Sequence, residues 1–164
     1  MDTNLKTILW KQFGAAIDML ENAVADCPEF LWNDKSLFWY NAYHTIFFLD
    51  YYLSEDADKF KPPEPYSLSE FNPDGELPER VYTKPELLSY VDYCRDKCRK
   101  LISSLSDENL QKRFKNQYMD YSRLEILLDN IRHVQHHTGQ LNLLIRQSGN
   151  VPPDWVSQTK EESL

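Results

Sequence analysis

Hydrophobic residues recur at helical spacing in four segments of the chain, and these segments predict its main elements. Apolar side chains three or four positions apart mark residues 4–25, 36–53, 83–105 and 122–147, a spacing that places them on one face of an α-helix. In the second segment apolar and aromatic residues occur on almost every side, which is typical of a helix buried all round. We therefore expect four helices, the second of them buried on most of its surface.

Local signals support the ends of these helices. A hydroxyl residue followed three positions later by glutamate occurs twice, at Thr83 with Glu86 and at Ser122 with Glu125. This pattern predicts a capping box, in which the two side chains satisfy free backbone N–H groups at a helix start. Pro28 ends the first helix, because proline cannot continue the backbone hydrogen bonds.

Two long connections separate the predicted helices. Residues 54–82 contain five prolines, which exclude a helix, and their aromatic residues predict packing against the core: Phe60, Tyr66, Phe71 and Tyr82. Residues 111–121 show no clear period, so we expect a connection there, and we expect residues 160–164 to fray. The sequence predicts an all-α fold, a four-helix bundle with long connections after helices 2 and 3, in one domain over residues 1–164.

Charge excludes some classes of partner. The chain has 164 residues, 41% of them hydrophobic, and a formal net charge of -8. A negative surface repels nucleic-acid backbones and anionic membranes, so we expect neither as a partner. No basic and apolar leader is visible at the N-terminus, and no apolar run reaches the ~20 residues of a membrane span, so we expect a cytoplasmic location.

All four histidines lie in two places. His44 lies within an aromatic run of the second predicted helix, whereas His133, His136 and His137 lie in the last one. On a helical wheel His133 and His137 share a flank and His136 faces outward. Two imidazoles four residues apart, joined by a third from a facing helix, can hold a metal ion with an open position. The pattern predicts a metal site formed by His44, His133 and His137, with the pair His133 and His136 ranked second.

Another interpretation stays open. A histidine surrounded by aromatic residues, as His44 is, can be a hydrogen-bonded core residue without any metal. Neither a His-Glu-x-x-His motif nor the Glu-x-x-His pairs of di-iron bundles occur, so a metalloprotease and a di-iron protein are disfavoured. Asp129, four residues before His133, either accepts a hydrogen bond from a ligand or is a solvated helix charge.

Four polar residues are candidates to line a pocket beside the histidines: Tyr40, Asn41, Asn130 and Gln140. Tyr40 and Asn41 belong to the second predicted helix, and Asn130 and Gln140 share a flank with His133 and His137 in the last helix. No spacing forces a general base toward the site, so the sequence names no catalytic residue.

The segment from His133 to Leu141, with Gly139 and Gln140 after the second ligand candidate, resembles the closing motif of the DinB-like (YfiT-like) superfamily of four-helix-bundle metalloproteins. The resemblance implies a divalent metal ion, zinc or nickel, held by three histidines with water or substrate in the open positions. A histidine of the second helix joins two of the last helix in that superfamily, and His44 fits the first role. The resemblance also suggests a homodimer.

Characterised members of that superfamily include thiol-dependent S-transferases and isomerases that use low-molecular-weight thiols, as well as proposed hydrolases. The first hypothesis is therefore a metal-dependent enzyme that activates a thiol or water for attack on a small-molecule substrate. The second is a non-catalytic helical bundle that acts in protein interaction or dimerisation and keeps a structural or vestigial metal site.

Overall fold

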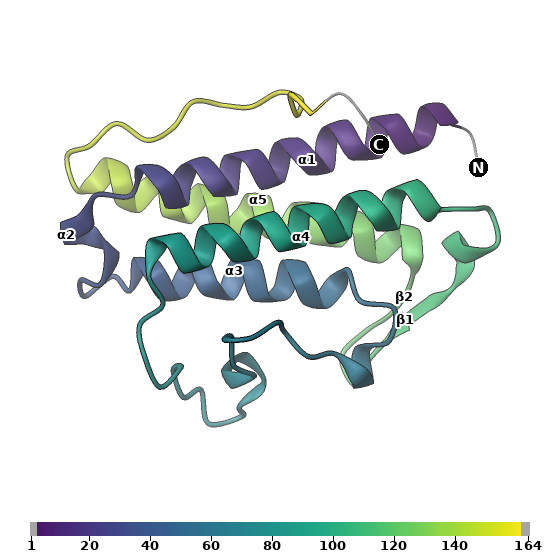
Figure 1. Ribbon diagram of the computed structural model, residues 1–164, viewed down its shortest axis with the longest axis horizontal. Helices are drawn as coiled ribbons and strands as arrows, with labels where there is room; N and C mark the ends of the chain where they lie inside the picture. The colour runs from purple at the N-terminus through teal and green to yellow at the C-terminus, as the bar shows by residue number, and fades with distance from the viewer. Residues whose placement is uncertain (1–2, 162–164) are drawn as a thin grey trace.

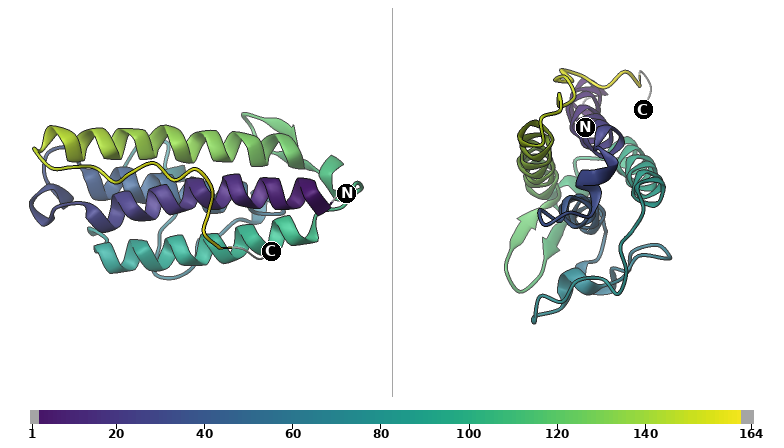
Figure 2. Two further views of the ribbon diagram at one scale, coloured as in Figure 1. Left: turned by 90° about the horizontal axis from the view of Figure 1, so that it is seen from above. Right: turned by 90° about the vertical axis from the view of Figure 1, so that its left-hand side faces the viewer.

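Four long helices form a bundle in the computed structural model, which describes residues 3–161 (Figure 1). They are α1 (Thr3–Asp26), α3 (Phe38–Tyr52), α4 (Lys84–Ser104) and α5 (Arg123–Gln147). Both α1 and α3 pack against α4 and α5, so α1 and α3 lie diagonally across the bundle, as the end-on view of Figure 2 shows. The all-α bundle predicted from the sequence is confirmed.

The starts of α4 and α5 agree with the sequence pattern. Thr83 and Glu86 form a complete capping box at α4, and Ser122 and Glu125 form a second one at α5. A short helix before α3 was not predicted, α2 (Glu29–Trp32). Its four residues make about one helical turn, which is too short for a periodic pattern to reveal.

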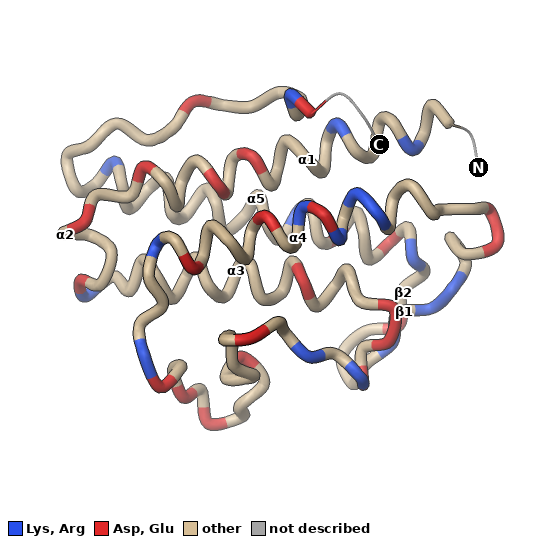
Figure 3. Tube along the Cα trace, viewed as in Figure 1, with Lys and Arg blue, Asp and Glu red and all other residues tan. Residues whose placement is uncertain are grey.

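Helix α3 is buried along almost its whole length, as its apolar composition predicts. Its single acidic residue is Asp50, whose side chain is fully buried. Tyr90 donates a 2.8 Å hydrogen bond to this carboxylate, and Lys97 pairs with it, so the buried charge is compensated. Figure 3 shows that acidic and basic positions are spread over the helices and the connections. No helix within residues 3–161 has both the length and the apolar character that a membrane crossing requires.

Two polar side chains of α5 fix how it runs against α3. The guanidinium of Arg123 donates to the carbonyl of Ser54 (2.8 Å), just beyond the C-terminal end of α3. About two turns further along α5, the Nδ2 group of Asn130 donates to the carbonyl of Leu49 (3.0 Å). Both donors are buried, and an unmade hydrogen bond there would be costly. The two contacts hold α3 and α5 antiparallel in one register.

Residues 54–82 pack against the bundle as predicted and contain two short 3₁₀ helices, η1 (Ala57–Lys59) and η2 (Ser69–Phe71). Phe60, Tyr66 and Tyr82 are buried, whereas Phe71 is 43% exposed. The hydroxyl of Tyr43, on α3, donates to the carbonyl of Ser67 (2.6 Å). The N–H of Ser67 donates to the hydroxyl of Tyr82 (3.0 Å), which ties the middle of this loop to its end.

The connection before α5 is more regular than predicted. After η3 (Asn109–Gln111), strands β1 (Arg113–Lys115) and β2 (Asp120–Ser122) form an antiparallel hairpin, with Phe114 opposite Tyr121. Phe114 is 1% exposed and its ring contacts those of Tyr51 and Tyr52. Strands of three residues are too short to show the alternation by which a strand is recognised, so the sequence predicted a connection here but not its hairpin.

The C-terminal segment runs back along α1, shown in yellow in Figure 1. The N–H of Thr159 donates to the carbonyl of Lys11 (3.1 Å), and the indole of Trp10 donates to the carbonyl of Glu161 (3.0 Å). Arg99 pairs with the carboxylate of Glu161. The expected fraying from residue 160 is therefore wrong at Glu161, because contacts with α1 and α4 hold it; residues 162–164 lie outside the described part of the chain.

Two helical glycines provide a test of this arrangement. A Cβ atom added at Gly14 would lie 2.6 Å from Cγ2 and 2.7 Å from Cβ of Thr159, whereas one at Gly139 would meet nothing within 4 Å. Gly14→Ala should lower the free energy of unfolding by about 1–3 kcal/mol, because the C-terminal segment is displaced. Gly139→Ala should raise it by about 0.5–1 kcal/mol through better helix propensity. Urea denaturation measures both, and a Gly14→Ala protein as stable as the wild type would contradict the contact.

Candidate metal centre

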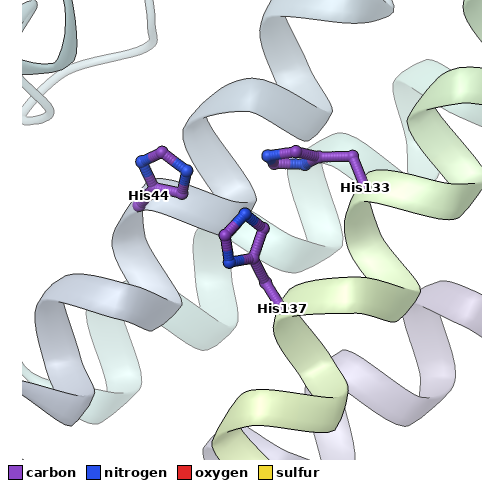
Figure 4. A group of neighbouring side chains, drawn as sticks. All are labelled: His44, His133 and His137. Atoms are coloured by element: carbon purple, nitrogen blue, oxygen red, sulfur yellow. The ribbon is translucent and has the colours of Figure 1, made fainter.

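Three histidine rings converge between α3 and α5 (Figure 4). His44 comes from α3, and His133 and His137 come from successive turns of α5. Ring centroids are 4.8 Å apart for His44 and His137, 5.6 Å for His44 and His133, and 4.5 Å for His133 and His137. One nitrogen of each ring lies within 4.8 Å of the others, so the three are close enough to share one ion.

The placement of each histidine on its helix follows the predicted pattern in most respects. His133 and His137 lie on the same flank of α5, as Figure 4 shows, whereas His136 is exposed. His44 is less buried than predicted, since 29% of its side chain is exposed. Its ring lies at the edge of the α3–α5 contact, where it also meets η2.

Two of the three imidazoles have an oxygen acceptor on one nitrogen. Nδ1 of His44 lies 2.6 Å from Oε2 of Glu70, and Nδ1 of His137 lies 2.8 Å from Oε1 of Gln140. A carboxylate or amide oxygen accepts hydrogen bonds, so each Nδ1 carries the proton. The lone pair is then on Nε2, the tautomer that a metal ligand needs.

The third imidazole is the most deeply buried. His133 packs against the rings of Phe48 and Tyr52, and its Nδ1 is buried with no hydrogen-bond partner among the described residues. Burial, and then the neighbouring imidazoles, lower the pKa of His133 to about 3. The pKa of His137 is lowered as well, first by burial and then by His44. Neutral imidazoles with available lone pairs are the donor set that a divalent cation such as zinc or nickel accepts, so these residues fit the predicted metal.

Glu70 is the residue of this site that sequence reasoning missed. It belongs to η2 in the proline-rich connection, 26 positions after His44, and only 3% of its side chain is exposed. Tyr40, one turn before His44, lies beside it: burial and the negative charge of Glu70 raise the pKa of Tyr40 to about 12. Tyr40 therefore remains a neutral phenol at physiological pH. No spacing rule relates a residue in an irregular loop to a helix, so the sequence carried no signal for Glu70.

The other candidate pocket residues are engaged in hydrogen bonds. The Nδ2 group of Asn41 donates to the carbonyls of Ser36 (3.2 Å) and Leu37 (3.3 Å) at the start of α3. Asn130 donates to the backbone of α3, and its Oδ1 is buried with no partner in the described part of the chain. Gln140 contacts His137. That Tyr40, Asn41, Asn130 and Gln140 line a substrate pocket remains a prediction.

Asp129 contacts a helix neighbour and not a histidine. Its carboxylate accepts a 3.2 Å hydrogen bond from Arg132, and 31% of its side chain is exposed. Of the two roles considered for Asp129, the structure therefore shows the solvated helix charge, and the carboxylate next to a candidate ligand is Glu70.

The lowered pKa of His133 predicts how stability depends on pH in protein treated with a chelator. The folded pKa of about 3 lies below the unfolded value, so the unfolded chain binds a proton first as the pH falls. The wild type should therefore lose about 1–2 kcal/mol of stability through His133 between about pH 7 and about pH 5. The variant His133→Phe, whose ring fits beside two aromatic rings, lacks this titrating group. Its loss of stability over the same pH range should therefore be smaller than that of the wild type by the same amount. Denaturant unfolding at both pH values measures the difference, and equal losses would contradict it.

Comparison with known proteins agrees with this arrangement. The model of the DinB family matches residues 78–163, which is more than half of the 164 residues and includes His133 and His137. The search of curated proteins finds no match. His44 precedes the matched region, and the structure brings it to the two histidines that lie within it. With its helical bundle and three convergent histidines, the chain belongs to the DinB family.

Proposed function

We propose that this protein is a metal-dependent enzyme in which His44, His133 and His137 hold one divalent ion, zinc or nickel. The observation that carries the proposal is the convergence of three imidazoles from two helices, with each Nδ1 of His44 and His137 held by an oxygen acceptor. Such contacts orient ligands and fix their tautomers in metal sites.

A site with three nitrogen ligands supports catalysis better than a purely structural role. Structural zinc sites have four protein ligands, whereas catalytic sites have three and leave a position for water or substrate. Among residues 3–161, no fourth histidine, cysteine, aspartate or glutamate joins the three histidines. This favours the enzyme over the alternative, a non-catalytic bundle in protein interaction or dimerisation.

The proposed reaction is the attack of a thiol or water on a small electrophilic substrate. A bound dication would lower the pKa of a thiol or water and so supply the nucleophile at neutral pH. The chain holds the three ligands, and the rings of Phe48 and Tyr52 cover one side of His133. Tyr40, a neutral phenol beside Glu70, is the candidate proton donor to a leaving group.

The family membership supports a small molecule, such as a low-molecular-weight thiol, as the substrate, and it supports a homodimer as the assembly. Both belong to the proposal, together with a cytoplasmic location.

Metal content tests the proposal. Protein prepared without a histidine tag should contain about one zinc or nickel ion per chain by elemental mass spectrometry. His44→Ala, His133→Ala and His137→Ala should each lose the ion, since two remaining imidazoles bind it weakly. His136→Ala is the matched control on the same helix, because His136 is exposed, and it should keep the ion.

Absence of metal from the wild type after loading with zinc or nickel would overturn the proposal and make the histidines ordinary core residues. Loss of metal from His136→Ala with retention in His44→Ala would show that the second-ranked pair, His133 and His136, binds it.

A further inference from the structure

The buried carboxylate of Glu70 is the only acidic side chain that pairs with one of the three histidines within the described residues. Its Oε2 lies 2.6 Å from Nδ1 of His44, while its Oε1 is buried without a hydrogen-bond partner in this part of the chain. A buried carboxylate is costly unless a positive charge or several donors compensate it. The Nδ1–H of His44 and the neighbouring phenol of Tyr40 are the groups on which the burial of Glu70 depends.

The backbone on both sides of Glu70 is anchored to α3. On one side, Tyr43 donates to the carbonyl of Ser67 (2.6 Å). On the other side, the ring of Phe71 lies 5.0 Å from that of Phe47 and 4.9 Å from that of Tyr51. These contacts place the carboxylate against His44 before any ligand arrives, and preorganisation of this kind is what an ordered metal ligand requires.

We infer that Glu70 is a positioning residue: it holds His44 in the tautomer with the proton on Nδ1 and directs Nε2 toward the other two histidines. The inference rests on the proposed function, and it makes the seating of the proline-rich connection a condition for tight metal binding. Glu70 acts through His44 and does not itself join the three ligands.

The tautomer of His44 is the first test, because it needs no bound metal. Long-range ¹H–¹⁵N NMR correlation spectra of chelator-treated protein at alkaline pH show which ring nitrogen is protonated. The wild type should carry the proton on Nδ1, and Glu70→Ala should move it to Nε2. Glu70→Gln keeps an oxygen acceptor of the same shape and should restore Nδ1 protonation. An Nδ1 proton that persists in Glu70→Ala would overturn the inference.

Zinc affinity, measured by competition with a chromophoric chelator, is the second test. Glu70→Ala should weaken zinc binding by about 10–100-fold, the usual cost of losing a group that orients a ligand, and Glu70→Gln should weaken it less. Glu79→Gln is the matched control, since it removes the same charge from an exposed position of the same connection. Equal affinities for Glu70→Ala and the wild type would overturn the inference.

The two proposals fail in different ways. A wild type that binds no zinc or nickel would overturn the proposed function, while the NMR spectra would still decide the role of Glu70 at His44. Thermal unfolding of each chelator-treated variant reports folding separately, and the isosteric Glu70→Gln keeps the test valid if Glu70→Ala is unstable.

Discussion

The antiparallel packing of α3 against α5 is the constraint on which the rest of the structure depends. It is held by side chains of α5 that donate to the backbone at and beyond the end of α3, Arg123 to Ser54 and Asn130 to Leu49. A shift of one residue along either helix would rotate a histidine by about 100° away from its partners. These polar contacts touch none of the three rings, yet they help to set the register in which the rings converge.

Much of this arrangement could be predicted from the chain alone. Helix periodicity and the two capping boxes depend on residues within one or two turns, so α4 and α5 begin where local rules place them. The spacing of His133 and His137 is also local, and it determines their common flank. Their meeting with His44 is not local, and it could be predicted because the aromatic surroundings of His44 indicated a helix inside the bundle and because the motif resembled that of a known superfamily.

The features that escaped prediction depend on contacts between distant segments or on very short elements. Glu70 reaches His44 from an irregular connection, and nothing in its neighbours along the chain distinguishes it from the other acidic residues there. The hairpin before α5 forms because Phe114 is buried against α3, a tertiary effect that overrides weak local preference. The segment up to Glu161 is held by side chains of α1 and α4, which lie far from it in the sequence.

The proline-rich connection contains two kinds of position, which differ in how freely they can be substituted. Tyr66 and Tyr82 anchor it in the core, while most of the residues from 68 to 81 are exposed. Substitution of Glu70, within that stretch, would act directly on His44, whereas substitutions at the exposed positions leave the three histidines of α3 and α5 in place. A lineage can therefore vary the exposed positions of this loop freely while Glu70 and the three histidines stay constant.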